Sequence, residues 1–292
     1  MKKIISLITL TLSLTTSHAQ EPARWLRANS ISPDAKTIAF EYHGDIYTVA
    51  ASGGEAKRLT SHSAYDGFPK FSPDGKWIAF SSERYGSPDI FIISPKGGKP
   101  IRLTTNSSIE TIQGWLDNNH ILYTSNLMPA INDISFPGSF QQVYCIDTEA
   151  HRPTMFSTIP MENISINNKK QLLYQNNKGY EDYWRKHHRS PICRDIYLTQ
   201  TDAKRTYQKL NTDTCEHRTP VWAPNGQSYY FTSEKNGTLN TYKATLNSNN
   251  ATQLTNYKGF PVRYLNSSTN GTLCYSWDGD LYTLKEGGKP TK

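Results

Sequence analysis

A short turn that recurs along the chain restricts the fold more than any other feature of the sequence. Its three clearest copies are Ser32-Pro33-Asp34, Ser72-Pro73-Asp74-Gly75 and Ala223-Pro224-Asn225-Gly226. Proline presets φ, the aspartate or asparagine side chain bonds back to its own backbone, and glycine accepts a positive φ. Ala35 stands where Gly75 stands in the second copy, so we expect the first turn to be less tight. Repetition of this kind indicates a repeat architecture.

Two further elements follow the turn in a fixed order. One begins a strand and reads Asp45-Ile46-Tyr47, Asp89-Ile90-Phe91, Gln142-Val143-Tyr144, Asp195-Ile196-Tyr197, Asn240-Thr241-Tyr242 and Asp280-Leu281-Tyr282. The other is a glycine pair and a last strand, as in Gly53-Gly54 with Arg58-Leu59-Thr60, and Gly97-Gly98 with Arg102-Leu103-Thr104. Each unit therefore predicts four strands in roughly 40–50 residues, which is the size of one propeller blade.

The units predict an all-β fold, a six-bladed β-propeller of four-stranded antiparallel blades. We expect blades at approximately residues 24–60, 65–104, 113–156, 164–212, 219–255 and 260–292, within a domain that spans residues 20–292. Only Thr291 and Lys292 follow the last glycine turn, so we expect the last blade to be incomplete. Either the N-terminus supplies its outer strand or the sequence is a fragment, and we favour a fragment.

The N-terminus predicts export. Lys2 and Lys3 precede an apolar run from Ile4 to Leu14, and Ser17-His18-Ala19 has the small residues of a cleavage site. This is the pattern of a secretory signal peptide over residues 1–19, cleaved after Ala19. We therefore expect a periplasmic or secreted protein without a membrane span, because no later apolar run is long enough to cross a bilayer.

The charge distribution argues against a nucleic-acid partner, and the cysteine content leaves the disulfide pairing open. The chain carries a formal net charge of +7, but its Lys and Arg residues are spread along the units rather than clustered. We read a solvated basic surface and expect no nucleic-acid partner. Cys145 and Cys274 lie inside strand patterns and are expected in the core. Cys193 and Cys215 could form a disulfide after export, but the sequence does not determine their pairing.

The recurring turn, the Asp-Ile-Tyr strand start and the Arg-Leu-Thr ending resemble the repeats of the TolB and tricorn group of propellers. A sharper resemblance is the insertion from Glu181 to His188, followed by Arg194-Asp195-Ile196-Tyr197. It looks like the fourth blade of the six-bladed propeller that opens tricorn-like serine peptidases. The resemblance implies that catalytic domains follow in such proteins, and that propellers filter and channel oligopeptides toward them. It carries no catalytic residue onto this sequence.

The residues themselves predict no catalytic, metal or cofactor site. No G-x-S-x-G motif or other nucleophile signature is present. The aspartates that recur once per unit, such as Asp45 and Asp89, are expected to be structural and to accept backbone N–H groups at a turn. His187 and His188 are adjacent, but a shared metal needs two more ligands that we do not find.

The insertion supplies the candidate contact residues for a peptide or a neighbouring domain: Tyr183, Trp184, Arg185, His187 and His188. Aromatic and arginine side chains commonly anchor interfaces. The alternative is that Trp184 packs under its own loop and that the loop is only structural.

Three functions are therefore compared. The first is the non-catalytic propeller portion of an exported tricorn-like serine peptidase, which gates or channels oligopeptides to a downstream catalytic domain. The second is a free-standing periplasmic TolB-like propeller that acts as a protein–protein interaction module. The third, an enzyme with its site in the propeller channel, has no motif in its favour. The expected partners are downstream peptidase domains or subunits and oligopeptides, and a homo-oligomer is left open.

Overall fold

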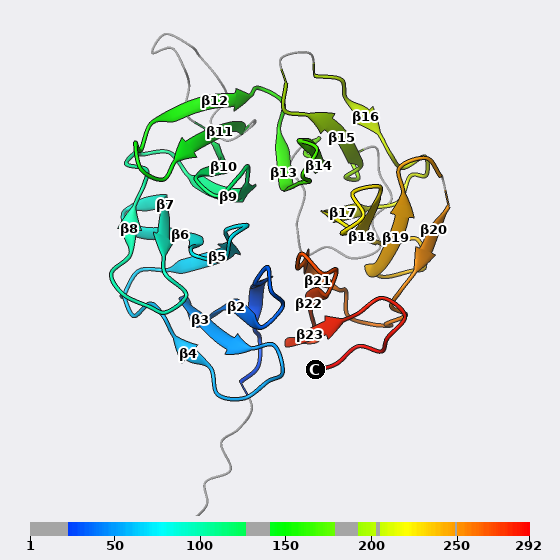
Figure 1. The fold of residues 1–292 in the computed structure, drawn as a ribbon, viewed down its shortest axis with the longest axis horizontal. Coiled ribbons are helices and arrows are strands. Elements are labelled where there is room, and N and C mark those ends of the chain that lie inside the picture. Colours follow the sequence, from blue (N-terminus) through cyan, green and yellow to red (C-terminus); the bar gives the residue numbers. More distant parts are fainter. Residues whose placement is uncertain (1–22, 127–140, 179–191, 203–204, 249) are drawn as a thin grey trace, which may run out of the picture.

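Six β-sheets stand around one axis in the computed structural model of the chain, so that the molecule is a ring of blades (Figure 1). The structure describes residues 23–126, 141–178, 192–202, 205–248 and 250–292. Within these ranges all regular secondary structure is β-strand, joined by turns and loops. The prediction of an all-β, six-bladed propeller is confirmed.

Each blade is an antiparallel meander in which strands that are consecutive in the chain are hydrogen-bonded neighbours. The first two blades contain β1 (Arg27–Ile31), β2 (Thr37–Tyr42), β3 (Asp45–Ala50), β4 (Lys57–Arg58), β5 (Asp66–Phe71), β6 (Ile78–Tyr85), β7 (Ser87–Ile93) and β8 (Ile101–Arg102). The next two contain β9 (Glu110–Trp115), β10 (His120–Ser125), β11 (Gln142–Asp147), β12 (Pro153–Ser157), β13 (Met161–Ile166), β14 (Gln171–Asn176), β15 (Ile196–Gln200) and β16 (Gln208–Lys209). The last two contain β17 (His217–Trp222), β18 (Ser228–Ser233), β19 (Asn240–Thr245), β20 (Ala251–Gln253), β21 (Arg263–Ser267), β22 (Leu273–Trp277) and β23 (Asp280–Leu284).

The last blade is incomplete, as predicted. Its described residues form a sheet of three strands, β21, β22 and β23. Beyond β23 a single antiparallel bridge joins Thr283 to Thr291, at the place where the outer strand begins in the other blades.

The hydrophobic core lies between neighbouring blades. Between the second and third blades, for example, Ile90 and Ile92 pack with Trp115 and Ile121. Equivalent clusters fill the other interfaces, and the smallest is the one between the sixth and first blades, where Ile31 and Ile38 pack against Cys274. Removing these side chains from water is what favours the stacking of the sheets.

The recurring aspartates do not have the partners that we expected. Each contacts the basic residue of the fourth strand position in its own blade rather than backbone N–H groups: Asp45 with Arg58, Asp89 with Arg102, Asp195 with Lys209, and Asp280 with Lys292. The threonine that ends the motif accepts a backbone hydrogen bond from the residue after the aspartate, as Thr104 Oγ1 does from Ile90 N at 2.8 Å. The ion pair and the threonine together hold a fourth strand that is otherwise very short.

The expectation that the first turn is less tight is wrong. Ala35 has a φ of 61°, close to the 71° of Gly75. The N–H groups of both residues donate to the carbonyl of the serine that opens the turn, Ser32 or Ser72, at 2.9 Å. The flanking strands impose the same geometry on both turns, and the alanine accommodates it.

The ring closes through contacts between the first and sixth blades. The first strand, β1, pairs with β2 of its own blade and contributes no strand to the sixth sheet within the described residues. Instead, Asn266 Oδ1 accepts a hydrogen bond from Ile31 N at 2.7 Å, and Asn266 Nδ2 donates to Asn29 O at 2.9 Å. The N–H of Leu26 also donates to Gly279 O at 2.9 Å.

Candidate functional site

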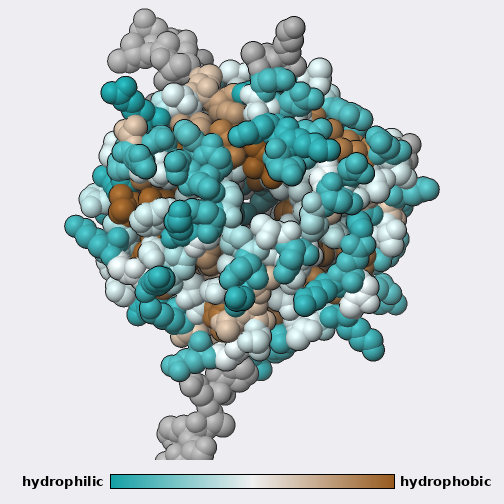
Figure 2. Space-filling model, in the orientation of Figure 1, coloured by the Kyte–Doolittle hydropathy of each residue, from teal (hydrophilic) through white to brown (hydrophobic). Residues whose placement is uncertain are grey.

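A central channel lined by the innermost strands is the candidate functional site. It contains two cavities of about 380 and 310 Å³, walled by residues of β1, β5, β9, β13, β17 and β21. Four residues line both cavities, and we call them the waist: Lys70, Gln113, Asn163 and Leu265. Figure 2 shows the surface hollowed near the centre of the ring. Concave sites of this size suit a small ligand or a few residues of a peptide.

A repeated bulge shapes the wall of the channel. In five of the innermost strands one non-glycine residue has a positive φ of 43–57°: Ala28, Phe68, Asn163, Thr219 and Tyr264. The pairing register shifts at each of these positions. A bulge of this kind redirects side chains and is strained for a residue that has a Cβ atom.

The strain is supported by the neighbouring blade. The N–H of Asn163 donates to Gln113 Oε1 of the preceding blade at 2.8 Å, and the N–H of Thr219 donates to Gln175 Oε1 at 2.9 Å. Indole groups also cross the blade boundaries, because Trp115 Nε1 donates to Lys70 O at 3.0 Å and Trp222 Nε1 donates to Ser165 O at 3.1 Å. These contacts tie the second to fifth blades together along the wall of the channel.

A lysine lies at the waist without an acidic partner. Lys70 is the one charged residue that lines the larger cavity among the residues that the structure describes. No hydrogen bond or ion pair joins its ammonium group to another described residue. Its side chain stays partly accessible to water inside the channel, yet protein surrounds it, and this burial lowers the pKa of Lys70 to about 8.

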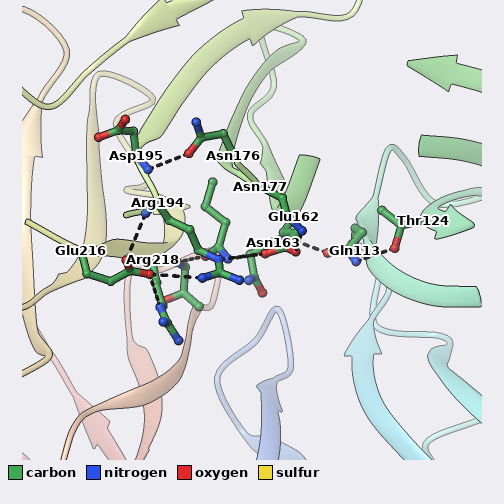
Figure 3. A network of polar contacts seen from close by, with 12 residues as sticks. Gln113, Thr124, Glu162, Asn163, Asn176, Asn177, Arg194, Asp195, Glu216 and Arg218 are labelled. Carbon is green, nitrogen blue, oxygen red and sulfur yellow. Dashed lines mark hydrogen bonds and ion pairs between the residues drawn. The ribbon is translucent and has the colours of Figure 1, made fainter. Parts of the chain in front are cut away.

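A buried ionic network forms one side of the smaller cavity (Figure 3). Arg194 lies between two carboxylates, with its Nε 3.2 Å from Glu162 Oε2 and its Nη1 3.5 Å from Glu216 Oε1. Arg218 Nε contacts the same Glu216 oxygen at 2.5 Å, and Gln175 Nε2 donates to Glu162 at 2.7 Å. The two acids and two arginines compensate one another, so we interpret the network as structural support.

The contact residues predicted in the insertion lie outside the described residues. They are Tyr183, Trp184, Arg185, His187 and His188. The residues that precede the insertion are tied to the channel wall. Asn177 Nδ2 donates to Glu162 Oε1 at 2.8 Å, and Lys178 Nζ lies 2.5 Å from Asp195 Oδ2. The last described residues before the insertion therefore lie beside the ionic network.

Sequence reasoning missed Lys70. An alignment of the six units could have found it. Two positions before the first turn, every other unit has an uncharged residue: Ser30, Gly114, Ser165, Val221 and Asn266. The sequence therefore shows that Lys70 is the one charged residue at this position of the repeat. It does not show that this position lines the channel.

The described residues show neither a metal site nor a membrane-spanning helix. In the described part of the chain no three His, Cys, Asp or Glu side chains converge in a way that could hold a metal ion. The same residues include no helix with the length and apolar character needed to cross a bilayer. Cys145 and Cys274 are buried, as expected, while no disulfide joins Cys193 to Cys215.

Known proteins resemble the chain in sequence. A family model described as the tricorn protease N-terminal beta propeller domain matches residues 23–289. Tricorn protease homolog 1 of Streptomyces coelicolor is 24% identical over 264 residues, which are 89% of this chain and 24% of that protein. A Protein TolB homolog of Chlorobium luteolum is 44% identical over 59 residues, which are 20% of this chain and 14% of that protein. The chain thus spans about a quarter of the length of the tricorn relative.

Solved structures resemble it in fold. The crystal structure of the tricorn protease superposes with a TM-score of 0.76 at 17% identity, covering 93% of this chain and 26% of that one. A putative TolB from Agrobacterium tumefaciens gives a TM-score of 0.63 at 14% identity, covering 88% of this chain and 83% of that one. At such identities the likeness establishes the fold, and function has to be argued from the site.

Proposed function

Because the chain belongs to the family of tricorn protease N-terminal beta propeller domains, we propose that it is the non-catalytic propeller portion of an exported tricorn-like serine peptidase. In this role the ring channels oligopeptides toward a downstream catalytic domain. The observation that carries the proposal is the central channel, whose two cavities of about 380 and 310 Å³ share the residues of the waist.

The channel wall suits a peptide more than a specific small molecule. Hydroxyl and amide side chains such as Ser30 and Asn163 offer hydrogen bonds, while Phe68 and Tyr264 add apolar surface beside the smaller cavity. An extended peptide advances about 3.3 Å per residue and presents donors and acceptors along its whole length. Such a wall holds peptides of many sequences weakly, as a channel requires.

A channel-narrowing substitution tests the proposal. Asn168 is an exposed turn residue at the wall of the larger cavity, and Lys169 follows it without lining that cavity. We expect Asn168→Trp to weaken binding of fluorescein-labelled oligopeptides, measured by fluorescence anisotropy, about tenfold. Lys169→Trp is the matched control and should bind as the unmodified chain does. Equal binding by both variants, or no oligopeptide binding at all, would contradict the channel.

The TolB-like alternative is kept because of the similarity of one stretch to a TolB homolog. A free-standing periplasmic propeller of that kind would bind a folded envelope protein on its surface rather than peptides in its channel. Its binding should be equal for the Asn168→Trp and Lys169→Trp variants, so the same pair of substitutions separates the two functions.

Export is part of the proposal, and it depends on residues 1–19, which lie outside the described residues. We propose cleavage after Ala19, with the mature protein in the periplasm or secreted. N-terminal sequencing of the protein from the periplasmic fraction should begin at Gln20. A cytoplasmic protein that retains Lys2 and Lys3 would contradict it.

The insertion is proposed as the surface that contacts a peptide or a peptidase domain, because Asn177, shortly before it in the chain, donates to Glu162 in the wall of the smaller cavity. The double substitution Trp184→Ala with Arg185→Ala should weaken docking of a catalytic portion while the melting temperature barely changes. Loss of folding would show that the loop is only structural.

A further inference from the structure

Two polar groups that the fold itself does not use line the waist of the channel. Lys70 comes from β5 in the second blade, and no described residue pairs with its ammonium group. Asn163 comes from β13 in the fourth blade. Its backbone N–H is bonded to Gln113, but no described residue hydrogen-bonds to its side-chain amide. Both residues line both cavities.

The other charges of the channel do not neutralise Lys70. Apart from Lys70, the charged residues that line the two cavities in the described part of the chain are Glu162 and Arg194, which pair with each other at 3.2 Å. The residues that β1, β9, β17 and β21 contribute to the wall are uncharged. The waist therefore carries a positive charge wherever Lys70 is protonated, in surroundings that strengthen its attraction for an anion.

Placing a lysine side chain at the waist costs stability, and this cost supports a role for Lys70 in binding. An ammonium group surrounded by protein loses hydration, and an unpaired one recovers nothing in return. Burial accordingly lowers the pKa of Lys70 to about 8. The equivalent residues of the other blades are uncharged, so the architecture of the repeat does not require a cation at this position.

From these observations we propose that the waist is a carboxylate-binding site, in which Lys70 and the amide of Asn163 hold an acidic group of a ligand in the channel. Three N–H donors of the lysine and two of the asparagine match the two acceptor oxygens of a carboxylate. The class of ligand rests on the proposed function: it is an oligopeptide with a free C-terminal carboxylate or an acidic side chain.

Three N-acetylated tetrapeptides test the site: one with a free C-terminal carboxylate, the same sequence as an amide, and an amide with an internal glutamate. Isothermal titration calorimetry on the purified chain should show the first, the third or both binding about tenfold more tightly than the plain amide. Which peptide gains identifies the source of the carboxylate. Lys70→Met keeps the apolar stem and should abolish the preference, whereas Lys70→Arg should keep most of it.

Lys76→Met provides the control, since Lys76 lies in the same blade, is exposed and pairs with Asp74. It should leave the preference unchanged. A second measurement needs no substitution: NMR of reductively dimethylated lysines should show the pKa of Lys70 rising when acetate or the acidic peptide binds. The site is wrong if acidic and amide peptides bind equally, or if Lys70→Met retains the preference.

The outcomes also separate this inference from the proposed function. Equal binding of all three peptides, lost in Asn168→Trp, would keep the peptide channel and overturn the carboxylate site. Acetate that raises the pKa of Lys70 while no peptide binds would keep the anion site and overturn the peptide channel.

Discussion

At the residue scale, tertiary structure changes the chemistry of Glu110 most clearly. This residue begins β9 and lies against the second blade, where it is 1% exposed and close to Asp89, which is fully buried. Burial, together with the charge of Asp89, raises the pKa of Glu110 to about 7. Two carboxyl groups at one blade interface cannot both ionise without cost, so the folded state holds a proton that the unfolded chain releases.

We therefore predict that Glu110 makes stability fall as pH rises. The folded pKa is raised above the unfolded value of 4.5, so the stabilisation is fully present below about pH 4.5 and is lost as pH approaches 7. Glu110→Gln should remove this dependence and gain roughly 1–3 kcal/mol over the unmodified protein at pH 8. Urea unfolding between pH 4.5 and pH 8 measures it, with the exposed Glu149→Gln as control. A constant difference between Glu110→Gln and the parent would refute the shifted pKa.

At the element scale, the turn between the first and second strands of a blade is set by a few side chains. In the second blade Ser72 Oγ donates to Asp74 Oδ1 at 2.7 Å and accepts from Trp77 N at 3.0 Å. Ser32 and Asp34 make the same bond in the first blade at 2.6 Å. These bonds and the flanking strands hold both turns alike, so the residue after the aspartate has a positive φ whether it is Ala35 or Gly75.

Reciprocal substitutions at this turn should have opposite signs. Ala35→Gly relieves a left-handed alanine and should stabilise the protein by about 0.5–1 kcal/mol, while Gly75→Ala should destabilise it by about 1 kcal/mol. Thermal unfolding of the two variants measures the contrast. If Ala35→Gly lowers the melting temperature, the loss of chain entropy outweighs the strain and the explanation fails.

At the scale of the whole molecule, we expect the seam between the sixth and first blades to be the weakest interface. Its apolar cluster is the smallest of the ring among the described residues, and hydrogen bonds of Asn266 and Asn29 also cross it. At the other boundaries larger apolar clusters hold the blades together, as between the second and third blades. A ring of blades opens first at its least stable interface. We therefore expect unfolding to begin with separation of the first and sixth blades.

Asn266→Ala should therefore destabilise the ring more than an equivalent change elsewhere. It removes the acceptor for Ile31 N and two donors, at a cost of roughly 2–3 kcal/mol. Ser165→Ala removes the comparable acceptor for Trp222 N between the fourth and fifth blades and should cost about 1 kcal/mol. Denaturant unfolding gives both values, and hydrogen exchange should show β1 and β21 exchanging faster in the Asn266→Ala variant. Equal losses in the two variants would argue against a weak seam.

Much of the fold could be predicted from local patterns, because each blade is built from contacts between residues that are close in sequence. The turn at Ser72 and Asp74 and the apolar run of β6 are legible without the rest of the chain. The candidate site was less accessible. Lys70 is ordinary in a linear sequence, and only the bulge at Phe68 and the positions of the other five innermost strands make it a residue of the channel.

The sequence by itself determined the repeat, the number of blades and the incomplete last sheet, since strand alternation and turn chemistry are short-range properties. Only the tertiary structure decided which groups come together across blade boundaries: Glu110 lies near Asp89, Asn266 accepts from Ile31 N, and Lys70 and Asn163 line the same cavities. The two members of each pair lie at least 20 residues apart along the chain. Burial and electrostatic interactions depend on their separation in space, which the linear sequence does not give. The pKa of Glu110, the hydrogen bond of Asn266 and the place of Lys70 in the channel therefore follow from how the blades pack.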